Sequence, residues 1–187
     1  MTTPCHVLMI CGSLRTGSTN EAALRTAAAV APGGVTTTLF DRLSELPHFN
    51  PDDDREPLHP TVAELRQGIG AADALLFCTP EYAGTLPGTL KNLLDWTIGG
   101  GEVNGTPAGW VNSSVAPTGA AGAYATLRSV LGYAGADLVE AACAHIPVPR
   151  DALGPDGLIT ESALRTEIAG VLTALSDHVA GKRTHQD

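Results

Sequence analysis

Hydroxyl and amide side chains gather in a glycine-containing turn near the start of the chain, directly after a short apolar run. The apolar run covers residues 6–11, and the turn, residues 12–20, reads Gly-Ser-Leu-Arg-Thr-Gly-Ser-Thr-Asn. Gly12 and Gly17 permit tight backbone geometry, so that successive N–H groups can converge on one point. The helix predicted to follow turns its positive end toward the same point. Such a turn suits an anion, and a phosphate monoester is the ligand that fits it.

Three interpretations of this turn compete with one another. A Walker A loop is excluded, because the Gly-Lys-Ser/Thr ending is absent. A dinucleotide fingerprint is a poor match, since Gly12 and Gly17 do not make G-x-G-x-x-G, although Asp41 could act as the acidic ribose ligand of that fold. The turn could also be an ordinary strand-to-helix connection that carries N-cap residues.

Length and charge restrict the classes of partner. The 187 residues suit one domain, spanning 1–187, with a single substantial core. The net charge of −9, with no run of Lys or Arg, argues against nucleic acid or an anionic membrane as the main partner. No apolar stretch reaches the length of a membrane span, and the first residues do not form a signal peptide. We therefore expect a cytoplasmic protein that binds neither nucleic acid nor a membrane.

The four cysteines predict neither a metal site nor a disulfide framework. Cys5, Cys11, Cys78 and Cys143 are widely spaced, with no C-x-x-C pair and no partnering histidine pattern. Cys11, Cys78 and Cys143 lie in apolar runs, where a free cysteine packs as a small hydrophobic residue. Cys11 and Cys78 would lie near the strand ends that carry the site, so a redox role is the alternative interpretation.

Short apolar runs alternate with helical patterns along the chain. The runs, each predicted to be a strand, are residues 6–11, 35–40, 74–78, 108–115 and 138–148. Helices are predicted at residues 20–30, 60–69, 90–96, 127–134 and 164–179, followed by a disordered tail over 182–187. Residues 41–60, which are rich in proline and acidic residues, are predicted to form a long irregular connection.

The repeated strand–helix order predicts both the fold and the place of the site. Strands that are apolar throughout indicate a parallel sheet with helices on both faces, which is a doubly wound α/β fold. Ligands bind such sheets at the carboxyl ends of the strands. We expect the loops after the first, third and fourth strands, residues 12–20, 79–88 and 116–122, to converge at that edge.

Two segments resemble the NADPH-dependent FMN reductase family of the flavodoxin-like superfamily, which includes quinone, azo and chromate reductases. One segment is the turn at residues 12–20. The other, residues 79–96, contains a Pro-Glu-Tyr loop that runs into Pro-Gly-x-Leu-Lys-Asn-x-x-Asp-Trp. The resemblance extends over residues 5–180 and implies a flavodoxin-like, five-stranded parallel sheet.

The resemblance also implies which residues hold FMN. The FMN phosphate is assigned to five residues of the turn, Ser13, Arg15, Ser18, Thr19 and Asn20. The flavin ring is assigned to the next loop, at Pro80, Glu81, Tyr82, Ala83 and Gly84. The pyrimidine end of the ring is assigned to Ser114, Thr118 and Gly119. In this third loop, Ala-Pro-Thr at 116–118 departs from the glycine-rich form usual in the family.

In such a family the chemistry belongs to the cofactor. Hydride would pass from NADPH or NADH to FMN, and then to a small acceptor such as a quinone, free flavin, an azo compound or an oxyanion. No catalytic side chain and no metal are implied, and Glu81 and Asp95 are interpreted as structural. The family also implies a homodimer or homotetramer.

Two other functions remain open from the sequence. A flavodoxin-type electron carrier would share the fold, the FMN and the acidic surface, but would serve a protein partner without NADPH turnover. A flavin-free binding or regulatory domain would require that the loops have lost their ligand. The Pro-Gly-Thr-Leu-Lys-Asn start of the third helix favours the reductase.

Overall fold

Five strands form one parallel sheet in the computed structural model, which describes residues 4–184. The strands are β1 (Cys5–Cys11), β2 (Val35–Phe40), β3 (Ala74–Cys78), β4 (Pro107–Asn112) and β5 (Asp137–His145). Their order in the sheet is β2-β1-β3-β4-β5, and every neighbouring pair is parallel. The predicted flavodoxin-like, doubly wound α/β fold is confirmed.

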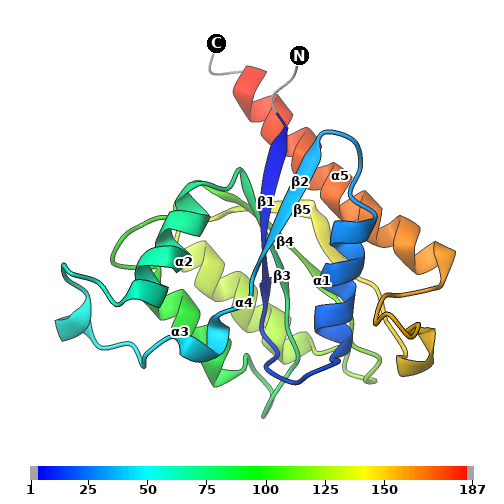
Figure 1. Cartoon of the computed structure of the whole chain (residues 1–187), viewed down its shortest axis with the longest axis horizontal. Coiled ribbons are helices and arrows are strands. Elements are labelled where there is room, and N and C mark those ends of the chain that lie inside the picture. The colour runs from blue at the N-terminus through cyan, green and yellow to red at the C-terminus, as the bar shows by residue number, and fades with distance from the viewer. Residues whose placement is uncertain (1–3, 185–187) are drawn as a thin grey trace.

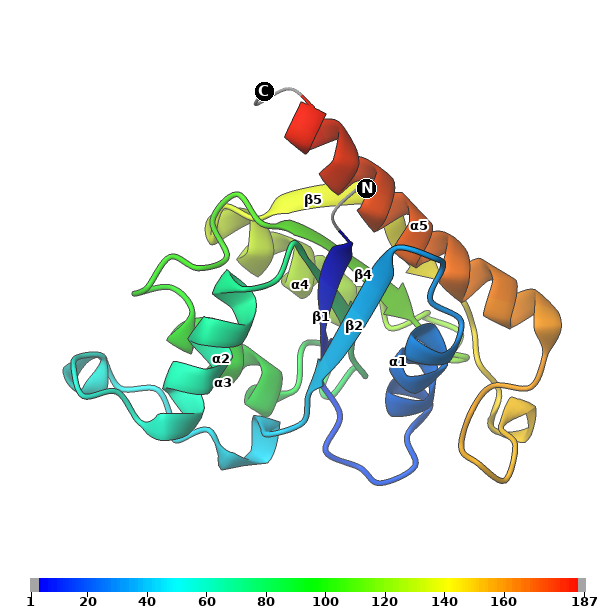
Figure 2. The same cartoon turned by 45° about the horizontal axis from the view of Figure 1, so that its top comes forward.

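Helices cover both faces of this sheet (Figure 1, Figure 2). The helices are α1 (Thr19–Ala29), α2 (Pro60–Gly70), α3 (Gly88–Trp96), α4 (Ala121–Tyr133) and α5 (Ser162–Thr184). Three short 3-10 turns are η1 (Leu43–Glu45), η2 (Pro51–Asp53) and η3 (Arg150–Ala152). In both views α1 and α5 lie on one side of the sheet, and α2, α3 and α4 lie on the other.

Two apolar layers hold the sheet between these helices. Along β1, Leu8 and Ile10 pack into the layer under α2, α3 and α4, whereas Val7 and Met9 pack into the layer under α1 and α5. Because both faces are covered, the strand is apolar at consecutive positions instead of alternating. Within residues 4–184, no helix is long and apolar enough to cross a membrane.

Two strands end earlier than the sequence pattern predicts. β4 was expected to reach residue 115 but ends at Asn112, because the Asn112 side chain accepts a hydrogen bond from Ser114 N at 3.1 Å and turns the chain. β5 was expected to reach residue 148 but ends at His145. Beyond it, Val148 N still donates to Ser113 O at 3.1 Å, so this segment continues beside the end of β4.

The predicted disordered tail is wrong for residues 182–184, which belong to α5. Lys182 Nζ donates to Asp137 Oδ2 at 2.8 Å and to Gly105 O at 2.9 Å, and Arg183 pairs with Asp73 at 2.6 Å. These basic residues also suit the negative C-terminal end of a helix. Residues 185–187 lie outside the described part of the chain.

The irregular connection at residues 41–60 is fixed to α3 by two side chains of the Lys-Asn-x-x-Asp-Trp motif. Asn92 accepts a hydrogen bond from Phe49 N at 2.7 Å and donates one to Pro47 O at 2.9 Å. Trp96 Nε1 also donates to Pro47 O at 2.8 Å, and the Phe49 ring meets the Trp96 ring edge-on, with centroids 5.0 Å apart. This motif therefore positions the connection.

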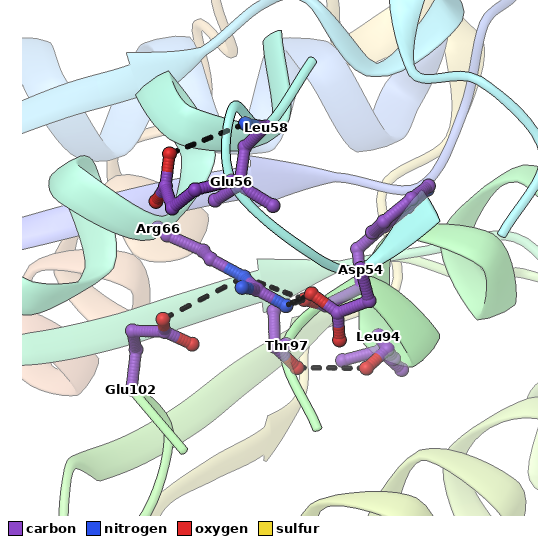
Figure 3. Close-up of polar contacts among 8 residues, drawn as sticks. Asp54, Glu56, Leu58, Arg66, Leu94, Thr97 and Glu102 are labelled. Atoms are coloured by element: carbon purple, nitrogen blue, oxygen red, sulfur yellow. Dashed lines mark hydrogen bonds and ion pairs between the residues drawn. The ribbon is translucent and has the colours of Figure 1, made fainter. Parts of the chain in front are cut away.

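An arginine on α2 fastens the far end of the same connection (Figure 3). Arg66 donates to Asp54 Oδ1 at 2.7 Å and to Trp96 O at 2.7 and 2.9 Å, and its Nε lies 3.6 Å from Glu102 Oε1. The three charged side chains are only 13–18% exposed. Arg66 thus joins the connection, the end of α3 and the segment before β4 at one guanidinium group.

Candidate functional site

A cleft of about 370 Å³ lies at the carboxyl ends of β1, β3 and β4. It is lined by the β1–α1 turn (residues 12–18), the start of α1, the β3–α3 loop (79–87), the β4–α4 loop (113–120) and the segment after β5. The lining residues are Ser13, Arg15, Thr19, Asn20, Thr79, Pro80, Glu81, Tyr82, Ser113, Ser114, Val115, Ala116, Thr118, Ala120, Val148 and Arg150. The predicted convergence of three loops on one edge of the sheet is confirmed.

The β1–α1 turn offers unused donors to this cleft. Ser18 is the N-cap of α1, since its Oγ accepts a hydrogen bond from Glu21 N at 3.1 Å. Within residues 4–184, the backbone N–H groups of Thr19 and Asn20 and the guanidinium of Arg15 have no acceptor. Gly17 has a φ of +63°, as its place in a tight turn requires. The turn therefore has the donor set of an anion site at a helix N-terminus.

Two of the residues that were predicted to bind the phosphate also have structural roles. Ser18 is 1% exposed, caps the helix and does not line the cleft. Asn20 is 7% exposed, and its Oδ1 accepts hydrogen bonds from the Cys78 thiol at 3.4 Å and the Ser113 hydroxyl at 3.3 Å. Asn20 therefore joins the ends of β3 and β4 to α1, while it also lines the cleft.

The β3–α3 loop is shaped by a tight turn that rests on α4. Tyr82 and Thr85 exchange backbone hydrogen bonds of 3.0 and 3.1 Å, and between them Ala83 and Gly84 have φ values of +51° and +77°. Glu81 Oε2 accepts a hydrogen bond from Ala123 N, in the first turn of α4, at 3.0 Å. Pro80, Glu81 and Tyr82 line the cleft, whereas Ala83 and Gly84 form the turn outside it.

The β4–α4 loop is closed by the side chain of Asn112. Its Oδ1 accepts from Ser114 N, and its Nδ2 donates to Gly119 O at 2.6 Å. His145 Nε2, at the end of β5, lies 2.9 Å from Ser114 O. Ser114 and Thr118 line the cleft, whereas Gly119 does not: its carbonyl accepts from Asn112, and its N–H donates to Ala116 O at 2.8 Å.

A buried tyrosine that the sequence patterns did not single out supports the start of the β3–α3 loop and the end of β4. Tyr124 of α4 accepts a hydrogen bond from Thr79 N at 3.2 Å and lies 3.0 Å from Val111 O, to which its hydroxyl donates. Burial raises the pKa of Tyr124 well above its usual value, so the group stays protonated. Thr79, Ser113 and Arg150 are further cleft residues that the sequence patterns missed.

The thiols below the cleft are protonated at neutral pH. Burial raises the pKa of Cys78 to about 12, and it raises the pKa of Cys11 as well. The Cys78 thiol donates to Asn20, and the Cys11 thiol donates to Ser13 O at 3.6 Å. Both side chains are buried in the layer under α1 and α5. The packing interpretation of these cysteines therefore fits the structure better than the redox interpretation.

The family resemblance implies flavin reduction, and Cys11→Ala and Cys78→Ala are each expected to keep its rate within about tenfold of the native rate, or about 1.4 kcal/mol of barrier. The physical reason is that neither protonated thiol is a competent nucleophile or electron carrier. Stopped-flow reduction of the bound flavin by NADPH measures this rate. If the rate collapses in either variant while flavin is still bound, a thiol takes part in the reaction.

A five-stranded parallel sheet with an anion-suited turn after β1 and two further loops around one cleft defines the flavodoxin-like class. The comparisons agree with this class: the model of the NADPH-dependent FMN reductase family matches residues 5–147. The chain belongs to the NADPH-dependent FMN reductase family. As a member it is an oxidoreductase that uses FMN as cofactor and NAD(P)H as reductant.

Individual relatives extend the likeness over nearly the whole chain. An NAD(P)H-dependent FMN reductase of Pseudomonas aeruginosa is 36% identical over 177 residues, which cover 94% of this chain and 95% of the relative. A quinone reductase of Escherichia coli is 28% identical over 183 residues, covering 96% and 97%. The structure of FerB, a flavoenzyme NAD(P)H:(acceptor) oxidoreductase from Paracoccus denitrificans, superposes with a TM-score of 0.79 at 28% identity, covering 95% and 98%.

Proposed function

We propose that the cleft binds FMN with its terminal phosphate against the β1–α1 turn, and that the enzyme reduces small quinones. The observation that carries this proposal is the convergence of unused donors on one side of the cleft. Among the described residues 4–184, the N–H groups of Thr19 and Asn20 at the positive end of α1 have no acceptor, and neither has the Arg15 guanidinium, which lines the same cleft. A phosphate dianion is the part of FMN that such a donor set fits.

Each of the predicted contact residues has a role in this proposal. Ser13, Arg15, Thr19 and Asn20 donate to the phosphate, and Ser18 holds the helix end in place by capping it. Pro80, Glu81 and Tyr82 flank the flavin ring, on a turn that Ala83 and Gly84 shape. Ser114 and Thr118 serve the pyrimidine end, on a loop that is closed through the Gly119 carbonyl.

We propose that the protein contributes to the reaction by orienting the flavin ring and the reductant. Bound FMN supplies the chemistry, because it can accept a hydride from NAD(P)H and return two electrons to an acceptor. The Glu81 carboxylate is occupied by Ala123 N, and Asp95 pairs with Lys91 at 2.6 Å, so neither acid is placed as a free base. Holding two rings in register is the contribution that the loops make.

A flavin spectrum and a turnover assay test this proposal. Purified protein should show bound flavin, and chromatography of the released flavin should identify it as FMN. Steady oxidation of NADPH in the presence of 1,4-benzoquinone is expected, since relatives of the chain are named quinone reductases. Flavin that is reduced once but never turned over would instead match the electron carrier, and the absence of any flavin would overturn the proposal.

We also propose that the chain forms a homodimer or a larger homo-oligomer in the cytoplasm. A groove beside α3 and α4 is lined by Phe49, Ile98, Val130 and Tyr133, with the charged Asp54, Lys91 and Asp95 among its other lining residues, and Tyr133 is 87% exposed. Such a patch on an otherwise acidic chain suits a subunit contact. All four cysteines are free thiols, which fits a reducing compartment.

The mass in solution is expected to be at least twice that of one chain, because two copies can bury this groove against each other. Light scattering at micromolar concentration measures it. Tyr133→Glu should shift the mass toward the monomer by placing a charge in the contact. A native mass of 19.2 kDa would contradict the oligomer.

A further inference from the structure

We propose that Arg150 is a second cation for the phosphate of the cofactor, contributed from the segment after β5. This inference rests on the proposed function, since it concerns the same cleft and the same ligand. Arg150 lies outside the part of the chain that the family model matches, which ends at residue 147. It is the first residue of η3 and lines the cleft together with Arg15, Thr19 and Asn20.

The segment that carries Arg150 is held at both ends. On one side, Val148 N donates to Ser113 O at 3.1 Å, beside the end of β4. On the other, Ile159 N donates to the buried hydroxyl of Thr26, in the middle of α1, at 3.0 Å. Prolines at positions 147 and 149 restrict the backbone immediately before Arg150. The segment therefore bridges from the sheet to α1, and hydrogen bonds hold its backbone on both sides of Arg150.

The same segment is closed on itself beyond Arg150. Thr160 donates to Ala152 O from its backbone N–H at 2.9 Å and from its hydroxyl at 3.0 Å. Leu153 and Ile159 form a short antiparallel bridge. These contacts fix the backbone of η3 but leave the guanidinium of Arg150 unused: within residues 4–184 it takes part in no hydrogen bond or ion pair.

The charged residues of the cleft indicate which ligand the Arg150 guanidinium can bind. The chain carries a net charge of −9, yet two of its basic side chains, Arg15 and Arg150, line one cleft. The one carboxylate among the described lining residues, that of Glu81, is turned to Ala123 N. A phosphate monoester is close to a dianion at neutral pH, so one arginine neutralises about half of its charge and two neutralise it. The two arginines match this ligand better than Arg15 alone.

Binding of FMN and of riboflavin to apoprotein tests the proposal, because riboflavin has the same ring and lacks the phosphate. Arg150→Ala should weaken FMN binding by about tenfold or more, which is the usual effect of losing a charge-assisted hydrogen bond. Riboflavin binding should stay within about twofold of the native value. Arg150→Lys should recover part of the FMN affinity, since it restores the charge without the planar fork.

Arg55→Ala is the matched control, because Arg55 is exposed on the connection at residues 41–60 and does not line the cleft. It removes the same charge from the molecule, so any loss of FMN affinity that it shares with Arg150→Ala is a long-range electrostatic effect. An Arg150→Ala variant that binds FMN as the control does overturns the proposal. Equal losses for FMN and riboflavin would assign Arg150 to packing, and a change confined to the KM for NADPH would assign it to the reductant; both overturn it. Native protein that binds no FMN would instead overturn the proposed function.

Discussion

Gly122→Ala is expected to displace the β3–α3 loop and to weaken FMN binding at least about tenfold. A Cβ at residue 122 would lie 2.1 Å from Gly84 O, a backbone atom that no side-chain rotation can move away. It would also lie 3.0 Å from Glu81 Oε2, which holds the loop to Ala123 N. Overpacking of this kind costs about 1–3 kcal/mol when the structure must shift. An FMN titration and urea unfolding measure the two effects.

Gly132→Ala is the control for this substitution, since Gly132 is on the same helix and a Cβ there would have no neighbour within 4 Å. It should leave FMN binding unchanged and stabilise the protein slightly, because alanine favours helix over glycine by about 0.5–1 kcal/mol. If both variants bind FMN with native affinity, the contact of the loop with α4 does not position the flavin site.

Arg66→Met is expected to lower the free energy of unfolding by about 2–4 kcal/mol, because it leaves two largely buried carboxylates without their cation. Asp54 and Trp96 O would lose their hydrogen bonds, and Glu102, whose Oε2 is buried without a partner in the described structure, would lose its ion pair as well. Urea unfolding gives the stability. Limited proteolysis should show earlier cleavage within residues 41–60.

Arg42→Met provides the contrast for the Arg66 variant. Arg42 also pairs with two carboxylates, those of Glu45 and Glu64, but all three side chains are 35–53% exposed. Exposed pairs contribute about 0–1 kcal/mol, so a small loss is expected. In a second test, adding Asp54→Asn and Glu102→Gln to Arg66→Met should restore part of the stability. Equal losses for Arg42→Met and Arg66→Met would refute the role assigned to the buried network.

The sequence predicted the parts of the molecule that depend on local chemistry. Residues that are neighbours in the chain specify a short apolar strand, a turn of hydroxyl side chains and an N-capped helix. The sequence alone could therefore predict the β1–α1 turn and a helix start close to Ser18, the N-cap in the structure. The sheet followed from strands that are apolar at consecutive positions, and the convergence of the loops followed from the parallel sheet.

The missed features depend on partners far apart in the chain. Asn92 and Trp96 belong to the motif that carried the family resemblance, yet their side chains bind the connection at Pro47, a pairing that no local pattern encodes. Tyr124 lay outside every helix that the sequence pattern predicted, and its hydroxyl contacts the start of the β3–α3 loop and the end of β4. Arg150 follows a proline-containing segment after β5 and has no local signal for a cleft residue.

The placement of β1 and of the last turn of α5 decides how the enzyme can be attached to a surface. β1 begins at Cys5, at the amino edge of the sheet, and the last turn of α5 is tied to the same edge through Asp73 and Asp137 (Figure 1). The cleft lies at the opposite, carboxyl edge. A linker to an electrode or a bead that leaves the structure before β1 or after the last turn of α5 would therefore leave the cleft facing the solution, open to a dissolved electron donor and acceptor.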